Sequence, residues 1–246
     1  MSLSLIAATA AAMIAPVLVS PTPAQAAGSD PVSVTIDAAD VAAAAENVNG
    51  LTFKGFGVLT ANSTSALLLD YKSQHPEKYW ELIETLFGGD RPIMNTIKIE
   101  MGNDRNTSTG PNPSTMRTRD EYPNVQREPG FQLAADAQLV AHGDVHVSIL
   151  RWNRPAWATD HAAQYIWFKN TVLAAYREYG IMVDSINPDA NETRTPEIQL
   201  YKDFSGWLRG DEKGYEGTSS ADPNSGFASD EERDLYRSIE TVAADT

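Results

Sequence analysis

Short apolar segments alternate with longer helical segments along most of this chain, and this alternation restricts the possible folds more than any other feature. Five segments have the residue pattern of strands, at 51–58, 95–100, 145–151, 181–186 and 239–244. Segments with helical spacing of apolar residues lie between or before them, at 77–87, 131–142, 162–179, 196–208 and 230–236. Strands joined through helices form parallel sheets with right-handed crossovers. The sequence therefore predicts an α/β fold with a parallel sheet.

The loops of this sheet favour a barrel over an open sheet. Polar loops follow most of the predicted strands, and the longest of them is 101–130, while a Gly/Ser/Asp-rich loop or insertion at 211–226 follows the predicted helix 196–208. No GxGxxG or Walker motif opens the first unit, which disfavours a nucleotide-binding fold. We therefore expect a (β/α)8 TIM barrel. Because five strands would leave an open edge, the chain is expected to stop after about the fifth strand of a longer barrel. A complete five-stranded α/β sandwich is the alternative.

The amino-terminal region has the composition of an export signal. Residues 3–19 are apolar and alanine-rich, and Ala24-Gln25-Ala26 fits the small-x-small rule for cleavage. The basic segment that usually opens such signals is missing, because no Lys or Arg precedes Lys54. An uncleaved membrane anchor is the alternative, but the segment is short for a span. We expect a secreted, bacterial protein without stable membrane insertion after cleavage.

These patterns divide the chain into three regions. They are a signal peptide at 1–26, a linker with an outlying strand (32–36) at 27–50, and the barrel domain at 51–246.

Charge and composition exclude several classes of partner. The formal net charge is -14, and such an acidic surface repels the phosphates of nucleic acids. The chain has no cysteine, which rules out disulfides and thiolate metal sites, and its four histidines lack a metal-ligand spacing. No metal or cofactor is expected. Neutral substrates such as carbohydrates remain compatible with this surface.

One carboxylate occupies a position typical of catalysis in barrels. Asn191-Glu192 follows the fourth predicted strand, and barrel active sites lie where the strands end. Glycoside hydrolysis uses a carboxyl group as acid and then base, and an Asn beside it can bind a sugar hydroxyl. The alternative is structural, with Asn191 as a helix cap and Glu192 at the positive end of a helix.

Other polar and aromatic residues follow the second and third strands. Trp152 and Trp157 lie in one loop, where they can stack on a sugar ring or simply pack under the rim of the barrel. Glu100 and Asp104 can bind sugar hydroxyls or a cation, or can order their loop.

At these points the chain resembles glycoside hydrolase family 59, the galactocerebrosidases. The similar segments are Phe53–Gly57 and Ser65–Tyr71, Lys98–Asp104, Thr107–Met116, Leu150–Trp157, Asn191-Glu192, and Val242–Asp245. The resemblance implies a retaining mechanism on terminal β-galactosides in a glycolipid or glycan, with Glu192 as proton donor and acceptor. It also implies that Asn191, Thr107 and Trp152 contact the galactose, and that the nucleophile is a glutamate after a seventh strand, beyond this chain.

The sequence departs from the family just before the Asn-Glu pair. The family usually has Trp there, but this chain has Ala190 after a longer Asn187-Pro188-Asp189 stretch. This difference loosens the inference about galactosylceramide itself. Two alternatives to a galactosidase stay open. One is a noncatalytic carbohydrate-binding remnant, and the other is a related barrel glycosidase with another sugar specificity.

Overall fold

The computed structural model describes most of the chain after its first 34 residues. The described residues are 35, 37–46, 50, 54–107, 110–142, 145–190, 192, 195–219 and 221–243, with only the backbone at 62–64. The chain divides into two compact units, Met1–Thr52 and Phe53–Thr246.

In the first unit the described element is helix α1 (Ala38–Ala45). Asp37 caps it by accepting the N–H groups of Ala39 and Asp40. The sequence analysis did not predict this helix, and the signal peptide and the strand predicted at 32–36 lie outside or almost wholly outside the described residues.

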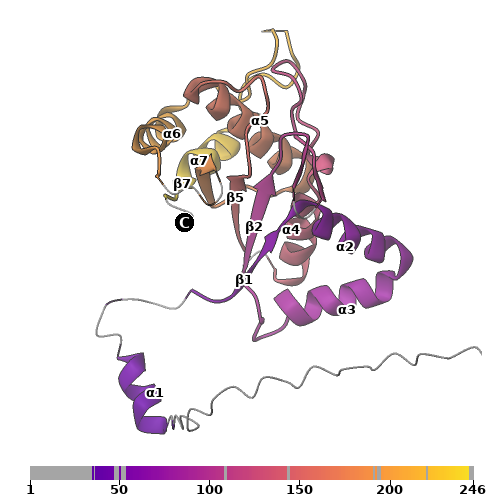
Figure 1. Cartoon of the computed structure of the whole chain (residues 1–246), viewed down its shortest axis with the longest axis vertical. Coiled ribbons are helices and arrows are strands. Elements are labelled where there is room, and N and C mark those ends of the chain that lie inside the picture. Colours follow the sequence, from indigo (N-terminus) through magenta and orange to yellow (C-terminus); the bar gives the residue numbers. More distant parts are fainter. Residues whose placement is uncertain are drawn as a thin grey trace, which may run out of the picture. The chain divides into compact units, whose positions relative to one another are not determined.

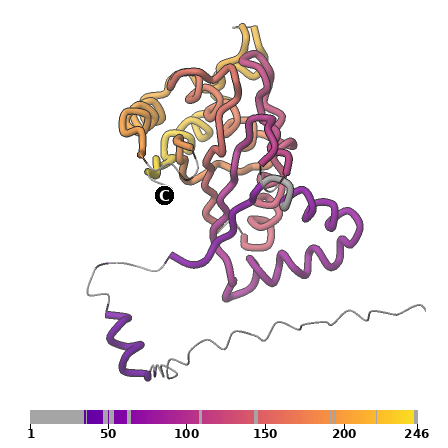
Figure 2. The backbone as a smooth tube through the Cα atoms, in the orientation of Figure 1, coloured from indigo at the N-terminus to yellow at the C-terminus, as the bar shows by residue number. Residues whose placement is uncertain are grey.

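The second unit is built on a parallel five-stranded sheet whose strands follow each other in chain order. The strands are β1 (Gly57–Thr60), β2 (Thr96–Met101), β5 (His146–Arg151), β6 (Ser185–Ala190) and β7 (Glu240–Thr241). Each pairs in parallel with the next. Figure 1 labels β1, β2, β5 and β7 of this sheet, and Figure 2 traces the same backbone coloured along the chain. A doubly wound sheet reverses its strand order, whereas a barrel does not. The predicted barrel-type α/β arrangement is confirmed.

Helices connect the strands, and most begin and end where the sequence suggests. They are α2 (Asn62–Gln74), α3 (Pro76–Phe87), α4 (Pro129–Val140), α5 (His161–Tyr179), α6 (Ile198–Gly210) and α7 (Asp230–Ser238). Asp160 caps α5 by accepting the N–H of Ala163 at 2.8 Å, and Gly180 ends it at a φ of 72°. A left-handed residue at this position is inexpensive only for glycine.

The structure corrects the element assignments in several places. The first strand was predicted at 51–58, but it lies at β1, and residues 54–56 are outside it. Helix α2 was not predicted. Its 3.6-residue periodicity is weak because its own apolar and polar residues are not separated onto opposite sides of the helix. The region predicted as the loop 101–130 contains a short antiparallel hairpin, β3 (Arg105–Thr107) and β4 (Gly110–Asn112), and a 3-10 turn, η1 (Val125–Arg127). The fourth strand was predicted at 181–186 but lies at β6. The prediction began too early because Ile181 and Val183 have the apolar pattern of a strand, and both are buried just before the strand pairing begins.

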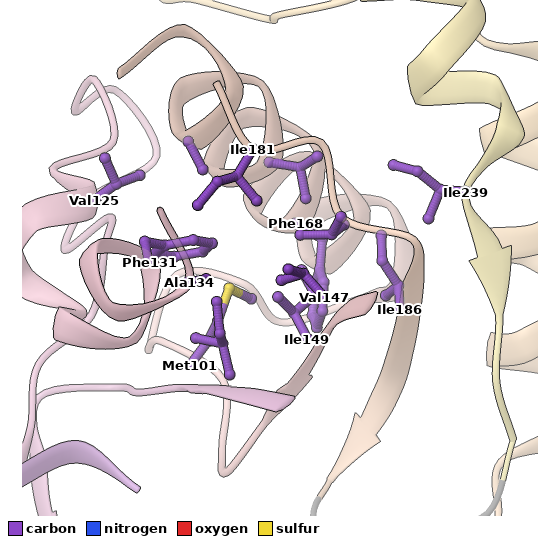
Figure 3. Close-up of a cluster of buried hydrophobic side chains, with 14 of the residues drawn as sticks. Met101, Val125, Phe131, Ala134, Val147, Ile149, Phe168, Ile181, Ile186 and Ile239 are labelled. Carbon is purple, nitrogen blue, oxygen red and sulfur yellow. The ribbon is translucent and has the colours of Figure 1, made fainter. Parts of the chain in front are cut away.

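The two faces of the sheet differ in polarity. One face presents Ile97, Ile99, Val147, Ile149 and Ile186 to the helices, and all five are at most 1% exposed. Figure 3 shows several of them with Phe131 of α4 and Phe168 of α5. The other face carries more polar side chains and lines a cavity of about 270 Å³, whose walls include Thr96, Lys98, His146, Ser148 and Ser185 together with Ile149 and Val242. The hydrophobic core therefore lies between the sheet and the helices.

Candidate functional site

The ends of three neighbouring strands form a straight row at one edge of the sheet. Met101 of β2 pairs with Arg151 of β5, and Arg151 pairs with Ala190 of β6. We call this row and the loops that leave it the carboxyl edge. Trp152 comes one residue after Arg151, and Glu192 comes two residues after Ala190. Because Arg151 and Ala190 are paired, the loops that carry Trp152 and Glu192 begin side by side. In an α/β barrel this edge carries the active site.

Glu192 is exposed to solvent at the carboxyl edge. Its backbone has a φ of 55°, one of three non-glycine residues with positive φ in the part of the chain that is described. Left-handed backbone is uncommon for a glutamate and persists where the surroundings hold it. Asn191, predicted to contact the sugar, lies outside the described residues.

The residues just before Glu192 form a dense set of polar contacts. Asp189 accepts the N–H of Ala190 at 2.7 Å and the N–H of Glu197 at 2.9 Å. Arg151 donates from Nε to the carbonyl of Pro188 at 2.7 Å, and its guanidinium lies 3.6 Å from the Asp189 carboxylate. Sequence reasoning had noted this stretch only as a departure from the resembled family.

A histidine joins the next two elements. His161, at the start of α5, contacts Asp203 of α6 and Glu197, each at 2.7 Å. Both ring nitrogens face carboxylates, and ionised carboxylates only accept hydrogen bonds, so the arrangement favours the protonated ring. The hydrogen bond with Asp203 is the main cause of a raised pKa at His161, and Glu197 adds to it against partial burial. This contact ties α5 to the segment that follows the Glu192 loop.

The two predicted sugar-contacting tryptophans occupy different environments. Trp152 is half-buried directly after β5, with its backbone N–H donating to the carbonyl of Met101 at 3.0 Å. Trp157 packs against the hydrophobic core, and its indole N–H donates to the carbonyl of Met116 at 3.0 Å. The indole of Trp157 therefore ties the loop after β5 to the segment after β4, whereas Trp152 is the first residue after β5.

The hairpin after β2 carries Thr107. The Thr107 hydroxyl donates to the carbonyl of Gly110 at 3.2 Å across this hairpin. Asp104, with a φ of 66°, binds the guanidinium of Arg117 at 2.9 Å. Asp104 thus has the loop-ordering role that was one of its two predicted alternatives. Thr107 and Trp152 belong to loops from neighbouring strands, β2 and β5.

A fully buried carboxyl lies at the start of α4 and was missed by the sequence analysis. Glu128 is 0% exposed, and its Oε1 accepts the N–H of Gly130 at 3.2 Å at the start of α4. Its Oε2 has no hydrogen-bond partner. Burial raises the pKa of Glu128 well above its ordinary value, against the Gly130 bond, and the charge of Glu100 raises it further. Glu128-Pro129-Gly130 has the sequence of an ordinary helix start, which gave no sign of this burial.

Replacing this carboxyl with its neutral isostere should stabilise the protein. Because the folded pKa of Glu128 is raised, its proton is held more tightly in the folded state, and stability falls as pH rises above the unfolded pKa of about 4.3. Glu128→Gln should therefore increase the free energy of unfolding by about 1 kcal/mol or more near neutral pH. Urea unfolding of both proteins at about pH 7 and about pH 4 tests this, since the difference should shrink toward zero at the lower pH. If Glu128→Gln and the unchanged protein were equally stable at both pH values, the ionised Glu128 carboxylate would not destabilise the fold, and the assignment would be wrong.

A family of known proteins matches most of the second unit. Residues 53–227 match the family model of glycosyl hydrolase family 59. No curated protein matches the chain. Among solved structures the chain is similar to the endo-β1,6-glucanase BT3312, at 18% identity and a TM-score of 0.45. That similarity covers 58% of this chain and 35% of the glucanase chain, so this chain spans well under two thirds of the glucanase. The family match covers well over half of the sequence, and the chain belongs to glycosyl hydrolase family 59.

Proposed function

We propose that this chain forms part of a retaining glycoside hydrolase that cleaves terminal β-galactosides, with Glu192 as its acid/base. The observation that carries this proposal is the place of Glu192 two residues after β6, at the carboxyl edge, in a chain of this family. The sugar and the roles of the residues follow the resemblance of the sequence to the galactocerebrosidases.

The proposed reaction has two steps. In the first, the protonated carboxyl of Glu192 gives its proton to the glycosidic oxygen while a second carboxylate attacks the anomeric carbon, so that the glycosidic bond breaks, the leaving group departs as an alcohol and a glycosyl-enzyme ester forms. In the second, the Glu192 carboxylate takes a proton from water, which attacks the same carbon, breaks the ester bond and releases the sugar and the free carboxylate. The nucleophile would be a glutamate on a later strand of the barrel. The exposure of Glu192 fits both steps, because it must meet a substrate and then a water molecule.

The sugar is proposed to lie over the loops that follow β2, β5 and β6. Trp152 offers a half-buried aromatic ring beside the row of strand ends, where it can stack on the apolar face of a galactose. Thr107 and Asn191 would bind hydroxyl groups. Trp157 is the weaker candidate, because its indole N–H is already bonded within the chain.

The cellular setting is also a proposal. We infer export through the segment 1–26, and the substrate is then a glycolipid or glycan outside the cell. Among the helices that the structure describes, none is both long and apolar enough to cross a membrane. The net charge of -14 fits a neutral substrate better than an anionic one.

A panel of chromogenic glycosides tests this function on the full-length enzyme. We expect β-galactoside hydrolysis to exceed that of β-glucoside, β-mannoside and β-xyloside by at least about tenfold in kcat/KM, because sugar hydroxyls bound by polar groups discriminate strongly. Preference for another glycoside would instead identify a barrel glycosidase of different specificity. Binding of galactosides without hydrolysis of any substrate would contradict the enzymatic proposal and favour a noncatalytic carbohydrate-binding protein.

A further inference from the structure

The strand that leads to Glu192 contains a bulge. Leu150 of β5 pairs with Asn187 of β6, but the next residue, Arg151, pairs with Ala190. Leu150 and Arg151 are consecutive on β5, but their partners on β6 are three positions apart. Pro188 and Asp189, which lie between those partners, have no partner on β5 in this register. Because Pro188 has no N–H to donate to a sheet ladder, a regular strand cannot continue through it. Bulges often re-aim side chains beside active sites.

The Asp189 carboxylate binds both ends of the loop that carries Glu192. One oxygen accepts the N–H of Ala190 at 2.7 Å, just before the loop, and the other accepts the N–H of Glu197 at 2.9 Å, just after it. Charge-assisted hydrogen bonds of this kind are stronger than those between neutral groups. A single buried side chain therefore binds the described residues on both sides of the Glu192 loop.

Arg151 connects this carboxylate to the neighbouring strand. Its Nε donates to the carbonyl of Pro188 at 2.7 Å, and its Nη2 lies 3.6 Å from Asp189. The side chains of Arg151 and Asp189 are 9% and 8% exposed. Burial lowers the pKa of Arg151 and the charge of Asp189 opposes this effect, but a guanidinium keeps its charge in proteins. The buried pair joins the strand before Trp152 to the strand before Glu192.

We propose that Asp189 is a positioning residue that holds Glu192 in place for proton transfer. The inference rests on the proposed function, because it needs Glu192 to be the acid/base. A general acid must lie within hydrogen-bond reach of the leaving oxygen, and a displacement of about 1 Å can lower the rate about a hundredfold. The left-handed backbone of Glu192 needs support from its surroundings, and Asp189 supplies it at both ends of the loop.

The test compares two substrates with the same sugar and different leaving groups. An alkyl leaving group needs a proton from the acid, whereas 2,4-dinitrophenolate leaves without one. In the full-length enzyme, Asp189→Asn keeps the size of the side chain but presents an NH2 group to one of the two N–H donors. We expect kcat/KM to fall about 10-fold to 100-fold for the alkyl glycoside and less than about threefold for the dinitrophenyl glycoside.

Asp184→Asn is the matched control. Asp184 also accepts a backbone N–H, that of Val147 at 2.7 Å, and it also joins β5 to β6, but at the start of the strands. This control should leave the ratio of the two kcat/KM values unchanged. An Asp189→Asn enzyme that loses equal activity on both substrates, or none on either, would overturn the proposal.

A second pair of variants covers the case in which Asp189→Asn does not fold. Glu197 has a φ of -82°, close to the value that proline imposes, so Glu197→Pro removes the N–H that binds Asp189 with little change of backbone. Glu197→Ala removes the same side chain and keeps this N–H. We expect Glu197→Pro to lose at least about fivefold more activity than Glu197→Ala on the alkyl glycoside alone. Equal losses in the two variants would also overturn the proposal.

The same substrates separate this proposal from the function on which it rests. If Glu192→Gln spares the dinitrophenyl glycoside and Asp189→Asn does not distinguish the substrates, the acid/base assignment stands and the positioning role of Asp189 is wrong. If Glu192→Gln leaves both substrates unaffected, the acid/base assignment itself is wrong.

Discussion

Glu192→Gln is expected to lower kcat/KM for an alkyl β-galactoside by at least about a thousandfold. Gln has the size and shape of Glu but no proton to give to the glycosidic oxygen and no carboxylate to activate water. The side chain is exposed, so the change should leave the unfolding temperature of the enzyme unaltered. Steady-state kinetics with the alkyl and dinitrophenyl glycosides, together with thermal unfolding, measure both effects.

Glu77→Gln supplies the control for this substitution. Glu77 is an exposed glutamate in the first turn of α3, a helix that leads to the start of β2 rather than to the carboxyl edge. The same chemical change there should not alter kinetics with either glycoside. Full activity in the Glu192→Gln enzyme would remove Glu192 from the mechanism, whatever the role of its neighbours.

Much of the fold could be predicted because periodicity and punctuation agree along the chain. Helix α5 begins after the Asp160 cap and ends before Gly180, and both bounds lie within one residue of the prediction, although its buried residues run round the helix rather than along one face. The order of the strands followed from the same pattern, because helices between strands enforce parallel neighbours. Helix α2 was not predicted because its apolar residues do not lie on one side of the helix, so the sequence shows no apolar face there.

The candidate site was predicted from position rather than from geometry. The expectation that functional residues follow strands placed Trp152 and Asn191-Glu192 on adjacent loops, and the pairing of Arg151 with Ala190 places the starts of those loops side by side. The bulge could not be foreseen, because it depends on which residues of β5 face Asn187 and Ala190. Likewise, the burial of Glu128 depends on how α4 meets the sheet, and local sequence does not encode that contact.

Lys169 is the charged residue whose loss should destabilise the protein most. Its side chain is 0% exposed on α5, where its ammonium binds Asp211 at 2.9 Å and Glu216 at 2.7 Å. Burial opposes ionisation of Asp211, but hydrogen bonds from Tyr165 and Lys169 and the lysine charge keep its pKa below the ordinary value. Removing the lysine would leave these carboxylates partly uncompensated in a protein interior.

Lys169→Met is therefore expected to lower the free energy of unfolding by about 3–5 kcal/mol, the usual cost of breaking a buried ion pair from one side. Lys78→Met is the matched control, because Lys78 pairs with Glu81 on the surface of α3, where both side chains are about two thirds exposed (68% and 65%). Solvent screens such a pair, and its loss should not change stability measurably. Urea unfolding of the full-length variants measures the difference.

A second measurement locates the effect of Lys169. Asp211 and Glu216 lie in the segment between α6 and α7, so losing their shared cation should loosen that segment before the rest of the barrel. Lys213 is 76% exposed in the same segment, and tryptic cleavage after it should become faster in Lys169→Met than in Lys78→Met. Equal cleavage rates and equal unfolding midpoints would mean that Tyr165 and the backbone N–H groups satisfy Asp211 without the lysine.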